Sequence, residues 1–308
     1  MAITADLVKE LRERTGAGMM ECKQALVDAG GNIEKAIEAM RKAGQAKADR
    51  KSGRRAAQGL IAIAIDREAA RAAMVEINCE TDFVAKEDSF QAFAAQVAKQ
   101  AVEVDPPTLD ALLSTRLEGP DGGTIEEQRR QLVARIGENI AIRRLASIAS
   151  TGGRVVSYLH GGRIGVLVAV RGGDERLAKD IAMHIAASRP LCVAEGDIPA
   201  DLLAKEKDIF TAQAAATGKP SQIVEKMVAG RLQKFVAEVT LLGQPFVKDP
   251  DMTVAKLLAT EGATIEQFQR FEVGEGLEKT TADFAGEVMA QVKGRTGGVP
   301  DGPREDMS

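Results

Sequence analysis

Apolar residues recur at three- and four-residue spacing through the first 43 residues, and glycines interrupt the pattern at 16–18 and 30–31. Thr4 stands where a hydroxyl can cap the first helix. The spacing predicts three short helices whose apolar positions are Leu7, Val8, Leu11, Cys22, Leu26, Val27, Ile33, Ile37 and Met40. We therefore expect a small three-helix module over residues 1–44.

Residues 45–58 lose this periodicity. They contain one acid, Asp49, and five basic residues: Lys47, Arg50, Lys51, Arg54 and Arg55. Unbalanced charge without an apolar face is typical of a solvated segment. The pattern predicts a basic linker over 45–58.

From residue 59 the period changes from helical to alternating. Ile61, Ile63 and Ile65 share one face, and residues 74–79 alternate again after a polar turn, which predicts a β-hairpin. Helices are expected next, the first capped by Ser89 and a later one opened by a capping box of Thr124 and Glu127. A strand over 139–148 completes a first α+β subdomain, residues 59–150.

A second stretch repeats this order. Two strand-like segments flank Gly161 and Gly162, a helical pattern follows up to about Ser188, and residues 265–273 read as a third strand. The repetition predicts a second, related α+β subdomain with an antiparallel sheet, built from residues 151–200 and 238–280.

Residues 201–237 interrupt the second subdomain with two helical patterns joined by a turn at 217–221. The second pattern carries a seam at spacings of three and four: Val224, Val228, Leu232, Phe235 and Val239. This predicts an inserted antiparallel helical hairpin, a coiled coil. We also expect a C-terminal helix module at 281–294 and a disordered tail at 295–308.

Composition argues against several functional classes. Forty-five acidic and 41 basic residues give a net charge of −4, and aromatic residues make up only 3%, so neither a positive field nor base-stacking platforms favour nucleic acid. The isolated cysteines Cys22, Cys79 and Cys192 suit a reducing compartment. No apolar run has the length of a signal or a membrane span. We expect a cytoplasmic protein without specific nucleic-acid or membrane partners.

Residues suited to catalysis are few. Of the two histidines, His184 lies on an apolar helix face and is expected in the core, whereas His160 ends a strand, where turn structure and binding are equally favoured. Residues 214–220 imitate a phosphate-binding loop but lack its first glycine and place Pro220 at the hydroxyl position. The sequence predicts no enzyme, no cofactor, no metal and no direct nucleotide binding.

The segment 78–86 joins a predicted strand to a predicted helix and contains Phe83 between Asp82 and Lys86. From the residues alone, burial of this ring in the core is favoured over a binding role. Two other functions stay open: an RNA- or ribosome-associated protein that uses the basic linker, and a thiol-dependent enzyme.

Several motifs resemble the bacterial elongation factor Ts family, the guanine-nucleotide exchange factors of elongation factor Tu. They follow the family order along nearly the whole chain: RTGAGMM at 14–20, TDFV at 81–84, IGEN at 136–139, YLHG at 158–161, GQPFV at 243–247 and RFEVGEG at 270–276. The resemblance implies an α+β fold with a UBA-like three-helix module, and a protein that loosens GDP from its partner without catalytic residues.

The resemblance also implies roles for individual residues. Thr81, Asp82, Phe83 and Val84 would enter the partner's GTP-binding domain and displace Mg²⁺ there. Further contacts with the GDP-bound or nucleotide-free partner are implied for Met19, Met20, Lys23, Lys51, Ile136, Gly137, His160 and Val247. Self-association stays open.

Two residues depart from the family pattern. Lys248 stands where some relatives carry Met, which puts the apolar part of the Val247 contact in question. Glu87 occupies a position often held by Asn, and we expect it to weaken a local helix cap without altering Phe83.

Overall fold

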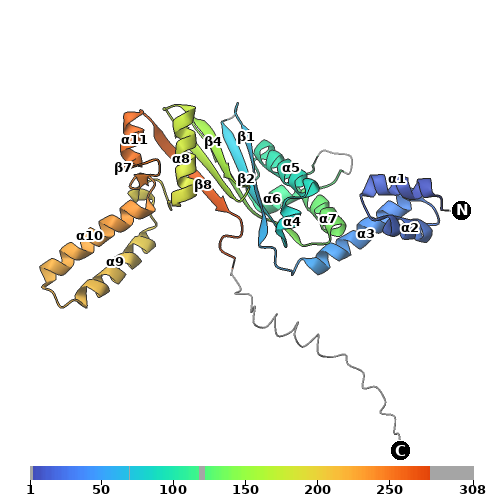
Figure 1. Ribbon diagram of the computed structural model, residues 1–308, viewed down its shortest axis with the longest axis horizontal. Helices are drawn as coiled ribbons and strands as arrows, with labels where there is room; N and C mark the ends of the chain where they lie inside the picture. The colour runs from blue at the N-terminus through green and yellow to red at the C-terminus, as the bar shows by residue number, and fades with distance from the viewer. Residues whose placement is uncertain (1–2, 69, 118–121, 278–308) are drawn as a thin grey trace, which may run out of the picture. The chain divides into compact units, whose positions relative to one another are not determined.

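The computed structural model describes residues 3–68, 70–117 and 122–277 of the 308-residue chain. Residues 1–274 form one compact unit that combines helices with antiparallel sheets, which confirms the predicted α+β class (Figure 1). The helix expected at 281–294 and the tail at 295–308 lie outside the described residues. The division of the unit into subdomains stays a prediction.

Three helices form the N-terminal module: α1 (Ala5–Thr15), α2 (Met19–Asp28) and α3 (Ile33–Lys51). The Thr4 hydroxyl accepts a hydrogen bond from the Leu7 amide, and Gly16 ends α1 in the left-handed conformation with φ 64°. The module has its own core, made of Val8, Leu11, Cys22, Leu26 and Ala36. The three helices confirm the prediction, but the third is longer than expected.

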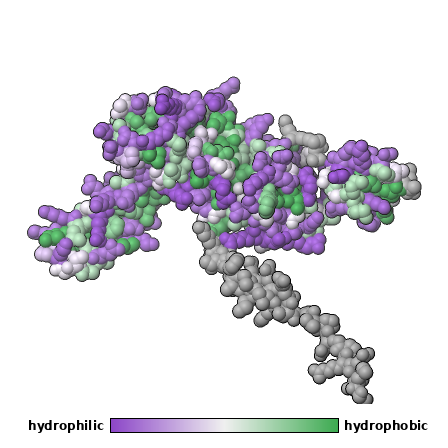
Figure 2. Space-filling view, viewed as in Figure 1, coloured by the Kyte–Doolittle hydropathy of each residue, from purple (hydrophilic) through white to green (hydrophobic). Residues whose placement is uncertain are grey.

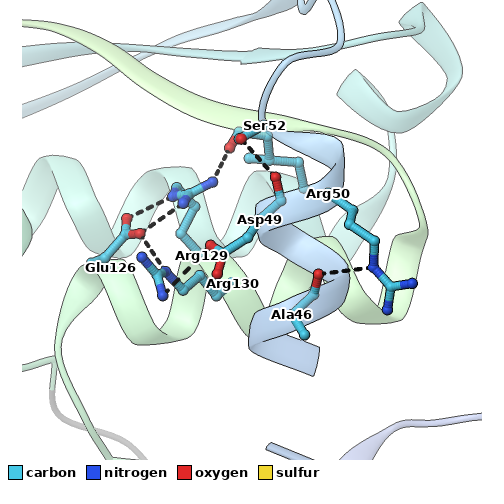
Figure 3. Close-up of polar contacts among 8 residues, drawn as sticks. Ala46, Asp49, Arg50, Ser52, Glu126, Arg129 and Arg130 are labelled. Atoms are coloured by element: carbon cyan, nitrogen blue, oxygen red, sulfur yellow. Dashed lines mark hydrogen bonds and ion pairs between the residues drawn. The ribbon is translucent and has the colours of Figure 1, made fainter. Parts of the chain in front are cut away.

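The predicted linker over 45–58 is wrong in its first half, because α3 continues to Lys51. Ala48 is buried in the core beneath the first sheet, and Asp49 lies 3.7 Å from Arg130 of α7 (Ile125–Ile136). Figure 3 shows α3 beside α7, with the Glu126 carboxylate bound to Arg129 and Arg130. Packing against α7 therefore supplies the partner that the local sequence pattern did not reveal.

The first sheet has the order β1 (Gln58–Asp66), β2 (Arg71–Cys79), β3 (Ile140–Ala149) and is antiparallel throughout. Helices α4 (Asp82–Ala85), α5 (Asp88–Val104), α6 (Leu109–Ser114) and α7 connect β2 to β3. The Thr124–Glu127 capping box is confirmed. The Ser89 cap is wrong: α5 begins at Asp88, and the Ser89 hydroxyl donates to the Glu87 carboxylate instead.

The second sheet repeats this order with β4 (Arg154–His160), β5 (Ile164–Arg171) and β8 (Thr264–Glu272), and α8 (Glu175–Ser188) packs on it. Three short elements between the inserted hairpin and β8 were not predicted: β6 (Pro245–Phe246), β7 (Asp249–Thr253) and α11 (Val254–Thr260). Each three-stranded sheet is therefore built in the order hairpin, helix, strand, and the second contains added elements.

The two sheets pack face to face, while α5 and α8 cover their outer faces (Figure 1). The shared core includes Ile61 and Met74 of the first sheet and Leu167 of the second. Gly165 allows this close approach, since a Cβ there would lie 2.5 Å from Ile61 and 2.6 Å from Met74. Small residues at such contacts let backbones approach where any side chain would clash.

A buried carboxylate also joins the sheets. Glu76 of β2 is fully buried and accepts hydrogen bonds from Arg143 and Arg144 of β3, from Asn78, and from the Gly274 amide just beyond β8. Burial alone raises the pKa of Glu76, but these donors outweigh it and hold that pKa below its ordinary value. The charge therefore persists inside the protein because it is fully paired.

The inserted hairpin consists of α9 (Ala200–Ala215) and α10 (Ser221–Val239), which follow a short 3₁₀ turn (Glu195–Asp197). The rings of Phe210 and Phe235 meet edge to face at 6.4 Å between centroids, and Val228 is buried. The seam predicted on α10 thus includes residues that pack on α9. Figure 2 shows apolar residues at the hairpin surface as well. Ile209 and Ile223 of the hairpin are both exposed.

Candidate functional site: an exposed aromatic side chain and its supports

Phe83 is the most exposed large apolar side chain among the described residues, with 81% of its surface accessible. It lies on α4, a single helical turn that follows β2, in the segment 80–87, which we call the Phe83 segment. The core position favoured by local sequence reasoning is therefore wrong. An exposed benzyl group buries none of its apolar surface within the chain, so Phe83 is a candidate for contact with a partner.

The neighbouring residues explain why the ring points outward. Val84 is buried against the core of the first sheet, and consecutive residues on one helical turn cannot share a face. Thr81 caps α4 by accepting a hydrogen bond from the Val84 amide. The Cys79 thiol donates to the Thr81 carbonyl at 3.1 Å. These contacts hold the N-terminal end of the turn that carries Phe83 and anchor its Val84 in the core.

Two carboxylates join the Phe83 segment to the turn after α7, and we call Glu80 and Glu138 the crossed carboxylate pair. Glu138 accepts hydrogen bonds from the amides of Glu80 and Thr81 at 3.2 and 3.0 Å and from the Thr81 hydroxyl at 2.7 Å. Glu80 accepts in return from the Asn139 amide at 2.6 Å. Hydrogen bonds to ionised groups are stronger than neutral ones, so the segment is held firmly.

Asp82, the neighbour of Phe83 on α4, forms an ion pair with Lys86. Lys86 lies 2.8 Å from Asp82 and lowers the pKa of that exposed carboxyl, first through the hydrogen bond and then through its charge.

Burial raises the pKa of the Cys79 thiol to about 12, with a further contribution from the Glu138 charge. A thiol with this pKa stays protonated at neutral pH, which argues against Cys79 as a nucleophile.

Ile136 and Gly137 lie beside the Phe83 segment, because they directly precede Glu138. Gly137 ends α7 with φ 86°, a conformation that side-chain-bearing residues rarely adopt. Ile136 is partly buried against the core of the first sheet. The structure thus brings two separate sequence motifs, 81–84 and 136–139, into one surface.

The N-terminal module carries a second exposed surface. Met19 and Met20 are 49% and 75% accessible on the first turn of α2, and Lys23 follows one turn later. Val27 is 52% accessible, although its apolar character suggested the core. Its spacing from Met20 and Lys23 is the signal that could have assigned it to their face. Lys51 is partly buried at the end of α3.

Two further predicted residues lie in the second half of the chain, one at the end of β4 and one after β6. His160 ends β4 and is exposed, with its ring stacked against Tyr158 at 6.2 Å and its Nδ1 3.1 Å from the Tyr158 hydroxyl. Val247 follows β6 and is 44% accessible. Lys248 turns toward α8, where it lies 2.6 Å from Asp180. Its charge is therefore engaged within the chain.

His184 binds the backbone of Val247 and is fully buried, which confirms its predicted core position. The Gln244 amide donates to the carbonyls of Ser188 and Glu238, so its oxygen faces Nε2 of His184 at 2.9 Å. Nε2 must then carry the proton, and Nδ1 accepts from the Val247 amide at 3.2 Å. Burial lowers the pKa of His184, while the Gln244 hydrogen bond opposes that shift.

The basic residues of the expected linker are partly engaged inside the protein. Arg54 lies 2.6 Å from Glu80, and Arg50 donates to the Ala46 carbonyl of its own helix. In the described ranges no cluster of three or more His, Cys, Asp or Glu side chains could hold a metal ion. No helix within those ranges is long and apolar enough to cross a membrane.

Comparison with known proteins agrees with the motifs. A family model described as "Elongation factor TS" matches residues 80–275, a match that begins at the Phe83 segment. The chain belongs to the elongation factor Ts family. Members of this family named elongation factor Ts include those of Methylococcus capsulatus, 58% identical over 95% of this chain and 99% of its own, and Thioalkalivibrio sulfidiphilus, 57% identical over 96% and 100%. Family membership makes the protein a translation elongation factor.

Proposed function

We propose that the protein is the guanine-nucleotide exchange factor of elongation factor Tu, and that it promotes GDP release by disturbing the Mg²⁺ and phosphate site of that partner. The observation that carries this proposal is the exposure of Phe83 on a turn whose N-cap, Thr81, is held by Glu138. The chain itself binds no nucleotide and performs no covalent chemistry. Its action is an exchange of binding energies.

Thermodynamic linkage supplies the mechanism. A factor that binds the nucleotide-free partner more tightly than the GDP-bound partner must weaken GDP binding by the same ratio. Each tenfold loosening requires about 1.4 kcal/mol of differential binding. Burial of a Phe ring supplies about 2 to 3 kcal/mol, provided that the partner's pocket opens only when the nucleotide site is disturbed.

The other predicted site residues make the remaining contacts with the partner. Asp82 and the adjacent Ile136–Gly137 turn support the Phe83 contact. The surface of Met19, Met20 and Lys23, together with Lys51, grips the same partner domain from the N-terminal module. His160 and Val247 reach a more distant partner domain. Contacts that form equally in both nucleotide states raise affinity, and only those that differ between the states accelerate release.

The test is the rate of GDP release in stopped-flow measurements with a fluorescent GDP analogue. Phe83→Ala removes about 2 to 3 kcal/mol of differential burial and should slow release at saturating factor roughly 30- to 150-fold. Val104→Ala is the matched control, since Val104 is also an exposed apolar residue, at the end of α5. Wild-type rates for Phe83→Ala, with an unchanged circular dichroism spectrum, would contradict the proposal.

A further inference from the structure

We infer that Glu138 is a positioning residue for Phe83, and that the crossed carboxylate pair ties the Phe83 segment to the end of α3. This inference rests on the proposed function, because it assigns a residue to the placement of the same aromatic side chain. Glu138 itself is partly buried behind the segment and faces the chain's own amides rather than solvent. It acts through Thr81, not through the partner.

The geometry at Thr81 explains how Glu138 sets the ring. The Thr81 hydroxyl donates to Glu138 at 2.7 Å, which fixes its rotation and turns an oxygen lone pair toward the Val84 amide 3.4 Å away. The same hydroxyl therefore satisfies the carboxylate and caps α4. Without Glu138, the hydroxyl could rotate, and two backbone amides of residues 80 and 81 would lose their acceptor.

The pair also reaches α3 through Asn139. Its side-chain amide donates to the carbonyls of Ser52 and Arg54, at 3.2 and 2.6 Å, and its backbone amide donates to Glu80. Arg54 also forms an ion pair with Glu80. Three chain segments thus meet at two carboxylates: the end of α3, the start of the Phe83 segment and the turn after α7.

The α3–α7 contact stiffens this junction. Asp49, Arg130 and Glu126 form the ion-pair chain drawn in Figure 3, and Arg129 donates to the Ile140 carbonyl at 2.6 Å. Since α3 is also the third helix of the N-terminal module, the module and Phe83 are joined through side chains as well as through the backbone. A partner that binds the module therefore contacts a helix whose last turn packs on α7 and is followed by the residues that bind Glu80 and Asn139.

The experiment measures GDP release from elongation factor Tu over a range of factor concentrations, so that the maximal rate and the half-saturating concentration are obtained separately. Glu138→Ala should lower the maximal rate about tenfold and change half-saturation less than twofold, because the outer contacts remain intact. Glu138→Gln keeps one acceptor and should restore part of the rate. Glu103→Ala, which breaks the exposed Lys99–Glu103 pair on α5, should behave as wild type.

A double-mutant cycle separates positioning from other effects. In a Phe83→Ala background, Glu138→Ala should cause little further loss, because the group that it positions is gone. Additive losses, or a wild-type maximal rate for Glu138→Ala, would overturn the inference and leave the proposed function standing. A wild-type rate for Phe83→Ala would overturn the proposed function first.

A second variant pair keeps the test decisive if Glu138→Ala fails to fold. Thr81→Val preserves the shape of the side chain but removes the hydroxyl that links Glu138 to α4, and Thr81→Ser restores it. We expect a loss of maximal rate with Val, recovery with Ser, and faster hydrogen exchange of the residue 84 amide with Val only. Equal rates for the two variants would contradict the inference.

Discussion

The two sheets are built in the same order, yet the connections from their central strands to their covering helices differ. In the second sheet, residues 172–174 make a tight glycine turn between β5 and α8, and Asp174 caps the helix. In the first sheet, residues 80–87 intervene between β2 and α5, and they contain α4 with its exposed ring. The comparison teaches that, among the described residues, the most exposed large apolar group lies in the longer connection, while the two sheets repeat the same strand order.

The largest predicted effect contrasts the two neighbours on α4. Val84→Ala should lower the free energy of unfolding by about 2 kcal/mol, since Val84 is buried in the core of the first sheet. Phe83→Ala should leave that free energy nearly unchanged. Urea denaturation followed by circular dichroism measures both, and a large loss of stability for Phe83→Ala would mean that the ring packs on its own chain.

A smaller effect is expected at the two helix starts. The Asp174 carboxylate accepts a hydrogen bond from the Leu177 amide at 2.7 Å, so Asp174→Ala should cost about 1 kcal/mol. Glu87 caps α5 without any side-chain bond to the helix backbone, as expected from the sequence, and Glu87→Ala should cost much less. The same denaturation experiment would contradict this contrast if both variants lost equal stability.

The smallest effect is a difference in acid sensitivity. His184 has a lowered pKa in the folded state, so its contribution is complete above its ordinary value of 6.5 and declines as the pH falls below it, where the unfolded chain binds the proton more readily. The pKa of Glu76 is lowered as well, so its contribution to stability declines only when the pH falls below 4.5. The second sheet should therefore weaken first on acidification.

The hydrogen-exchange protection factor of the Val247 amide, which is the intrinsic rate divided by the observed rate at the same pH, measures this weakening between pH 7 and pH 5, because that amide donates to His184. His184→Gln carries no titrating group and should remove the pH dependence in this range. A dependence that persists in this variant would assign the effect to another group.

Much of the fold followed from periodicity, because sheets and long helices bury continuous stripes. The three-helix module, both hairpins and the α10 seam belong to this class. The continuation of α3 did not, since its stabilising partners Arg130 and the first core lie far along the chain. The short elements β6, β7 and α11 were missed for a different reason: too few residues repeat to establish a period.

Parts of the candidate site could likewise be predicted from the sequence, and other parts could not. Local rules placed Phe83 in the core, because they assume that an aromatic ring packs within its own chain. Only the resemblance of residues 81–84 to a family motif indicated the opposite. Glu138 carried no local signal, because its role depends on amides 57 and 58 residues away. Side chains that position others are visible only once the segments meet.

The central claim is that Phe83 contributes more to binding the nucleotide-free partner than to binding the GDP-bound partner. The most direct test is the ratio of the two dissociation constants, measured by titration calorimetry for the wild type and for Phe83→Ala. We predict that the substitution lowers the dissociation constant of the GDP-bound complex divided by that of the nucleotide-free complex roughly 30- to 150-fold, mainly by weakening the nucleotide-free complex. An unchanged ratio would contradict the account, whatever the absolute affinities.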